Sequence, residues 1–146
     1  MVARSQPMTD RDAALLALRS TVDAAPEAAV SDVEEFLHRT LRPVLKLQNG
    51  PLLALVAADV ARNVPGFATF APDDARERLV SRLKADARLK RVLLGVVLGV
   101  LTADELAFAL THDAEVRRRV MGLVVERVRS QAETVRALAG QDSASG

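Results

Sequence analysis

The ten residues 92–101, VLLGVVLGVL, restrict the possible folds of this chain more than any other segment, because they include no polar side chain. As a helix they would span about 15 Å, half the hydrocarbon thickness of a bilayer, which takes about 20 residues to cross. Two basic residues precede the run and two acidic residues follow it closely, so it cannot be extended in either direction. We therefore expect a buried central helix near residues 88–101 in a protein core, and no membrane partner.

Gly95 and Gly99 interrupt this run four residues apart, which places them on the same face of a helix. Glycine in a helix interior costs about 1 kcal/mol relative to alanine, and the close approach of another backbone can offset that cost. The neighbour can be another helix of this chain or a helix of a second copy. The two glycines thus predict either a helix-packing face or an oligomer face.

Most of the remaining chain has the apolar spacing of amphipathic helices. In residues 10–22, for example, Leu15, Leu18 and Val22 recur at intervals of three and four. No second segment exists with which a strand could pair, and 146 residues suit one domain. We predict an all-α, single-domain bundle of about six or seven helices over residues 9–139, with disordered tails at 1–8 and 140–146.

Several positions carry signals that begin or end a helix. Pro43 lacks a backbone donor, so a kink or short break is expected near Arg42. Thr102 and Glu105 have the spacing of a capping box, which predicts a helix start. Further boundaries are predicted at Asn49-Gly50-Pro51, at Pro65-Gly66 and at His112-Asp113, before a long last helix over residues 114–139.

The composition excludes several kinds of chemistry. The chain has no cysteine, so disulfides, thiol nucleophiles and zinc–thiolate sites are impossible. No Gly-x-Ser-x-Gly elbow and no glycine-rich phosphate loop are present. We expect no catalytic residues and no cofactor. The first residues contain no apolar signal region, which together with the missing cysteines suggests a cytoplasmic location.

Three residues give a weak indication of metal binding or catalysis. Glu35 and His38 have the i, i+3 spacing found in four-helix di-iron sites, but no second such pair follows. Asp59 lies in an apolar segment and would be the best candidate for a general base. The simpler interpretation pairs Asp59 with Arg62 or Asn63, one turn further on.

Two basic runs, residues 76–91 and residues 117–119, suggest nucleic-acid binding. Lys84, Arg88 and Arg91 would fall on one face of a continuous helix and could follow a phosphate backbone. Acidic residues at pairing distance offer the alternative that these cations form local ion pairs.

Residues 102–119 resemble a helix-turn-helix, with a capped first helix, a short turn and arginines in the second helix. The resemblance implies DNA binding, with Arg117 and Arg118 facing the duplex. The motif is degenerate, because Ala107 and Val116 are nine residues apart instead of ten, and Thr111 replaces the usual turn glycine.

The longest loop carries Phe67 and Phe70, which could anchor a partner or fold back to cover the bundle. Taken together, these patterns favour a non-enzymatic α-helical interaction or regulatory module that acts through protein–protein contacts and self-associates. A DNA-binding regulator that uses residues 102–119 is the alternative. A metal-binding or enzymatic helical bundle is the third hypothesis.

Overall fold

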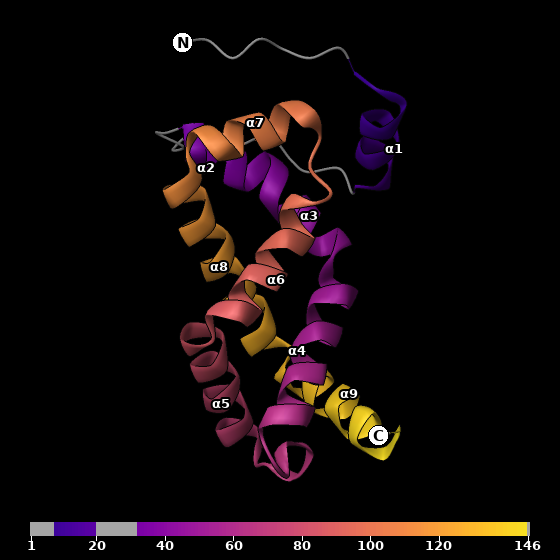
Figure 1. Ribbon diagram of the computed structural model, residues 1–146, viewed down its shortest axis with the longest axis vertical. Helices are drawn as coiled ribbons and strands as arrows, with labels where there is room; N and C mark the ends of the chain where they lie inside the picture. Colours follow the sequence, from indigo (N-terminus) through magenta and orange to yellow (C-terminus); the bar gives the residue numbers. More distant parts are fainter. Residues whose placement is uncertain (1–7, 20–31, 146) are drawn as a thin grey trace. The chain divides into compact units, whose positions relative to one another are not determined.

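Residues 8–19 and 32–145 are described by the computed structural model shown in Figure 1. Regular structure in these two ranges is entirely helical, so the all-α prediction is confirmed. The helices are α1 (Asp10–Leu18), α2 (Asp32–Phe36), the π-helix η1 (Leu37–Leu41), α3 (Arg42–Leu47), α4 (Asn49–Asn63), the 3₁₀-helix η2 (Phe67–Thr69), α5 (Pro72–Ala85), α6 (Ala87–Leu98), α7 (Ala103–Thr111), α8 (Asp113–Ser130) and α9 (Ala132–Ser145).

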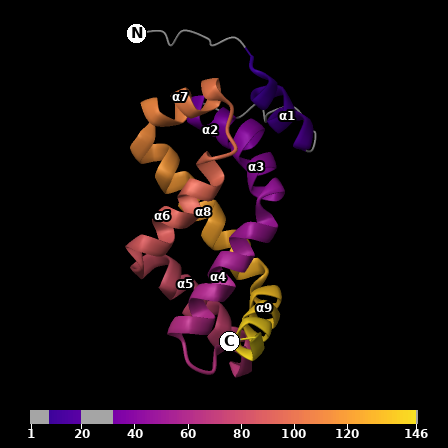
Figure 2. The ribbon, with the colours of Figure 1, turned by 45° about the vertical axis from the view of Figure 1, so that its right-hand side comes forward.

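This single all-α domain contains two compact units, which we describe separately. Unit 1 comprises the described residues of Met1–Gln48 and Leu94–Val120, and unit 2 those of Asn49–Leu93 and Met121–Gly146. Helices α6 and α8 contribute residues to both units. Within unit 2, α9 packs against α4 and α5, and its position beside α4 can be followed in Figures 1 and 2.

In unit 1, α2, η1 and α3 form one uninterrupted helix that contains the predicted irregularity. Its middle turn is π-helical, and the backbone N–H of Arg42 donates to the carbonyl of Leu37, five residues earlier. A wider turn directly before Pro43 relieves the crowding that a proline ring causes in a regular helix. The kink or break expected near Arg42 is therefore a π-turn that ends there. The buried apolar residues of unit 1 are Val33, Phe36, Leu41, Val44, Leu45, Val97, Leu101, Ala109, Val116 and Val120.

In unit 2, α4 is stopped by Pro65-Gly66, as predicted. Gly66 adopts the left-handed conformation (φ 72°), which glycine tolerates without steric cost. The chain then turns through η2 into α5, and the apolar faces of α4, α5 and α9 form the core. The buried apolar residues of unit 2 are Leu52, Leu53, Val56, Ala57, Val60, Val64, Phe67, Ala75, Leu79, Leu83, Leu89, Leu93, Val124, Val128, Ala132, Val135 and Ala139.

Helix α6 contains most of the apolar run, and it is buried along one side only. Leu89, Leu93 and Val97 are buried at helical spacing, whereas Val92 is 43% exposed and Gly95 is also exposed. The helix expected to be buried near residues 88–101 is therefore buried through this one side, and its opposite side is exposed. Two glycines lie on the outer face of this run. Because glycine has no side chain, the outer face exposes less apolar surface than its lack of polar residues would suggest.

The structure also differs from the sequence at three boundaries. The predicted helix 114–139 is divided at Gln131, whose backbone N–H is shared between the carbonyls of Arg127 and Val128. Helix α9 continues to Ser145, through residues that we expected to form a tail. The expected stop at Gly50 lies instead at Gln48, and Gly50 belongs to the first turn of α4. Of the predicted N-terminal tail, only residue 8 is among the described residues.

No single helix in the described ranges is long and apolar enough to cross a membrane. The consecutive helices over residues 32–47 and 49–63 reach the required length and hydropathy only when they are taken together.

Candidate interaction surfaces

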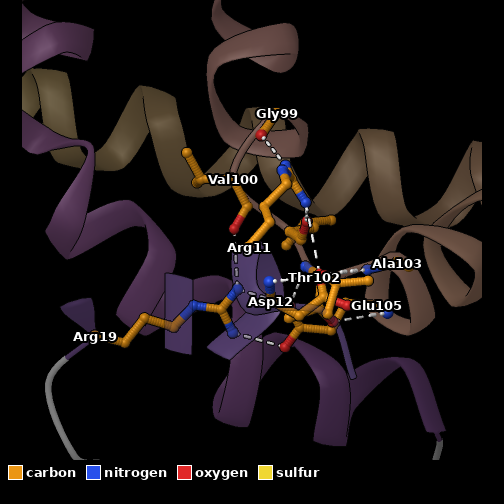
Figure 3. Close-up of polar contacts among 10 residues, drawn as sticks. Arg11, Asp12, Arg19, Gly99, Val100, Thr102, Ala103 and Glu105 are labelled. Carbon is orange, nitrogen blue, oxygen red and sulfur yellow. Dashed lines mark hydrogen bonds and ion pairs between the residues drawn. The ribbon is translucent and has the colours of Figure 1, made fainter. Parts of the chain in front are cut away.

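Helix α1 contacts the rest of unit 1 with its charged side. Asp12 is its only buried residue, at 4% exposure, whereas Leu16 and Leu18 are 39% and 64% exposed. Of the predicted apolar stripe, Leu18 is exposed, Leu15 is half-buried and Val22 lies outside the described residues, so the expectation is wrong for Leu18. Arg11 and Asp12 of α1, and Arg19 directly after it, instead meet the turn that joins α6 to α7, residues 99–105, which we call the α6–α7 turn (Figure 3).

The strongest contact of α1 is the ion pair between Arg19 and Glu105. Both guanidinium Nη atoms donate to the two carboxylate oxygens at 2.6 Å, and the side chains are 7% and 18% exposed. Arg19 Nη2 also donates to the carbonyl of Val100 at 3.0 Å. Paired charges with this geometry and little exposure form strong charge-assisted hydrogen bonds.

Glu105 is held in place independently of α1 by a capping box. The backbone N–H of Thr102 donates to Glu105 Oε1 at 2.8 Å, and the N–H of Glu105 donates to Thr102 Oγ1. Burial alone would raise the pKa of the Glu105 carboxyl, but the hydrogen bonds from Arg19 and Thr102 outweigh it, and the pKa is lowered. The predicted helix start at Thr102 is confirmed. The lowered pKa favours the charged form of Glu105, which is the form that pairs with Arg19.

Arg11 and Asp12 complete the contact by matching the two helix ends. Arg11 donates to the carbonyls of Gly99 and Leu101 at 2.9 and 3.2 Å, and Asp12 Oδ1 accepts from the N–H of Ala103 at 3.2 Å. The end of a helix leaves carbonyls free and carries partial negative charge, whereas the start of the next helix leaves N–H groups free. The cation therefore lies at the end of α6 and the anion at the start of α7.

Sequence reasoning missed Arg11, Asp12 and Arg19. A partial signal was present, because residues 12 and 19 are seven positions apart, about two helical turns, and so share a side of a helix. The leucines at 15, 16 and 18 concealed this charged side.

The two glycines of the apolar run have different surroundings. A Cβ added at Gly95 would meet nothing within 4 Å, so no other helix of the described residues packs closely there. A Cβ added at Gly99 would lie 2.9 Å from the carbonyl oxygen of Gly95, which is closer than real contacts allow. Glycine is therefore required at position 99 because the last turn of α6 leaves no room for a Cβ. For Gly95, no helix-packing partner is present among the described residues.

An ion network in unit 2 accounts for Asp59. Arg82 donates to both Asp59 carboxylate oxygens at 2.8 and 3.0 Å, and the side chain of Asn63 donates to Asp59 Oδ1 at 3.0 Å. The expected pairing with Asn63 is present, while Arg62 donates to the carbonyl of Ala58 instead. With three hydrogen bonds on its carboxylate, Asp59 is a structural anion and offers little as a general base.

Arg82 connects Asp59 to Asp86, which starts α6. Hydrogen bonding to Asp59 raises the pKa of Arg82 further above its ordinary value. Asp86 accepts from Arg82 and, at the helix start, from the backbone N–H of Leu89, and this backbone hydrogen bond is the main cause that lowers the pKa of Asp86. A shallow groove of about 410 Å³ lies along this network, lined by Leu55, Asp59, Arg62, Asn63, Asp86, Arg88, Leu89 and Val92.

The two loop phenylalanines differ in exposure. Phe67 is buried at 2%, so it belongs to the core of unit 2 and is not accessible to a partner. The Phe70 ring is partly buried, 5.5 Å from the Phe67 ring, with the Arg78 guanidinium 5.8 Å above it. Phe70 also lines an open pocket over the start of α5, so it alone of the two keeps a surface for contact.

The basic residues do not form the predicted continuous face. Lys84 belongs to α5, whereas Arg88 and Arg91 belong to α6, and the extended residue Asp86 separates the two helices. All three side chains are exposed. The shared helical face assumed for them is therefore wrong.

The resemblance of residues 102–119 to a helix-turn-helix does not extend to its geometry. Only His112 separates α7 from α8, whereas the motif joins its helices by a turn of three or four residues. Arg117 is paired with Asp113 at 2.7 Å, and Arg118 is exposed.

Glu35 and His38 have no third potential metal ligand beside them in the part of the chain that the structure describes. Glu35 is 54% exposed and pairs with Arg39 at 3.1 Å. No group of three or more potential ligands in the two described ranges could hold a metal ion.

No protein-family model matches the chain, and searches of curated proteins and of solved structures also find no match.

Proposed function

We propose that this chain is a non-enzymatic, cytoplasmic α-helical interaction module that acts through protein–protein contacts and self-associates through the face of α6 that contains Gly95. The observation that carries the proposal is that Gly95 lies exposed in a helix interior, with open space where its Cβ would be, one turn after the exposed apolar residue Val92. Such a glycine costs about 1 kcal/mol relative to alanine and has no compensating contact nearby in the described chain.

A second copy of the chain can supply that compensation. Where glycine replaces a side chain, two helix backbones can approach closely, and most soluble oligomers are symmetric pairs of identical surfaces. Two copies of α6 would meet through Gly95 in such a pair.

The experiment compares the mass of the wild-type chain with that of two matched variants by sedimentation velocity over about 1–100 µM. Gly95→Arg introduces a large charged side chain on the proposed face. Gly122→Arg makes the same change at another exposed helical glycine with open space around it, on α8. We expect association of the wild type and of Gly122→Arg, and a monomeric Gly95→Arg with unchanged helical circular dichroism. A wild-type chain that stays monomeric over this range would exclude the proposal, and so would equal effects of the two variants.

A further inference from the structure

Helix α1 is bound to unit 1 in the manner of a ligand. Its contacts are hydrogen bonds and ion pairs from Arg11, Asp12 and Arg19, and none of its apolar residues is buried. It has nine residues, fewer than the 12–15 at which an isolated helix becomes even marginally stable in water. Its helical structure and its docking therefore depend on each other.

The α6–α7 turn has hydrogen bonds of its own in addition to those that it makes with α1. The Glu105 carboxylate is oriented by the capping box with Thr102, and the carbonyls of the turn follow the end of α6 at Leu98. The turn therefore presents Glu105 and the carbonyls of Gly99, Val100 and Leu101 to guanidinium groups, and the N–H of Ala103 to a carboxylate. Figure 3 shows the Arg11 and Arg19 side chains directed toward these groups.

We propose that the α6–α7 turn is a binding site for a short helical segment with two arginines and an aspartate in the spacing of Arg11, Asp12 and Arg19. Helix α1 occupies this site as a tethered ligand. The same segment of a second copy can replace it. The second copy is the chosen occupant because its charges complement this turn group by group. This exchange does not depend on Gly95, so it can be tested independently of self-association through α6.

The probe is a fluorescently labelled peptide of residues 8–19, MTDRDAALLALR, and the receptor is the full-length chain with Arg11→Ala and Arg19→Ala. Removing both guanidinium groups from the tethered α1 opens the turn to the peptide. We expect saturable binding in fluorescence anisotropy that weakens between about 50 and about 500 mM salt, because the contacts are ionic. The wild-type chain should bind at least about ten-fold more weakly, because its own α1 competes at a high effective concentration.

Two controls separate ionic recognition from adventitious binding. A peptide with alanine at both arginine positions should not bind. Glu105→Gln, introduced into the receptor, keeps the capping box because glutamine can also occupy that position. It removes the charge that would face Arg19 of the peptide. We expect binding to fall at least about ten-fold in that receptor.

Either of two results would overturn the proposal. One is the absence of peptide binding to a receptor whose circular dichroism matches the wild type. The other is binding that neither salt nor Glu105→Gln weakens, which would indicate contact through Leu16 and Leu18. If the double variant loses its helical signal, the single variant Arg19→Ala, which removes the ion pair with Glu105, serves as receptor under the same criteria.

Discussion

Substitution of the helical glycines by alanine tests directly how the surface of α6 is used. A Cβ at Gly95 meets nothing within 4 Å, and its φ is not positive, so alanine introduces neither a clash nor backbone strain. Replacing this glycine should raise the free energy of unfolding by about 0.5–1 kcal/mol, because the unfolded chain loses conformational freedom. For a chain of this size, that gain corresponds to a rise in Tm of about 3 °C.

The neighbouring glycine should respond in the opposite direction. Gly99→Ala places a Cβ 2.9 Å from the carbonyl oxygen of Gly95, so the backbone must shift, at a cost of about 1–3 kcal/mol. Gly122→Ala is the matched control, since its Cβ also meets nothing within 4 Å, and it should stabilise as Gly95→Ala does.

The assay is thermal and urea unfolding followed by circular dichroism, at about 1 µM and again at about 100 µM, where association contributes to stability by mass action. At the low concentration Gly95→Ala and Gly122→Ala should gain equally. At the high concentration the gain at Gly95 should shrink or reverse, because a methyl group separates the two copies. If Gly95→Ala destabilised the chain at low concentration while Gly122→Ala stabilised it, the face would already be covered within one chain and the reasoning would be refuted.

Two further predictions concern the ion pairs. Asp59→Asn should lower the free energy of unfolding by about 1–3 kcal/mol, because Arg82 loses a charged acceptor. The control Arg62→Ala should change it by less than about 0.5 kcal/mol. Equal urea midpoints for the two variants would contradict this role of Asp59. The lowered pKa of Glu105 means that its contribution to stability is complete above the ordinary pKa of 4.5 and is lost as the pH falls through the lower folded value. Urea unfolding between about pH 3 and 7 should therefore show a smaller loss of stability in acid for Glu105→Gln than for the wild type. The variant Glu126→Gln changes an exposed carboxylate and serves as the control. Parallel pH curves for Glu105→Gln and the wild type would count against this role of Glu105.

Local signals in the sequence predict the helices and many of their ends. The capping box at Thr102, the stop at Pro65-Gly66 and the break at His112 depend on residues within four positions of each other, and all are present. Pro43 indicates where the helix is irregular, but a proline alone does not distinguish a kink from a π-turn.

Contacts between distant residues could not be predicted in the same way. Asp59 binds Arg82, 23 residues away, in addition to the nearby Asn63. Apolar periodicity placed the leucines of α1 inward, because nothing near that helix shows that a turn 86 residues further on presents a carboxylate to Arg19. The candidate site therefore depends on information that periodicity does not contain.

Glu105 takes part in two interactions: it caps the first turn of α7, and it binds Arg19 at the end of the docked α1. Two equilibria that share one group are linked, and the coupling between them is reciprocal. If the formed first turn of α7 strengthens the docking of α1 by a given factor, then docked α1 strengthens the formation of that turn by the same factor. A ligand that draws α1 away therefore loosens the first turn of α7. The N-terminal segment can thus influence a helix 86 residues further along the chain through a single carboxylate.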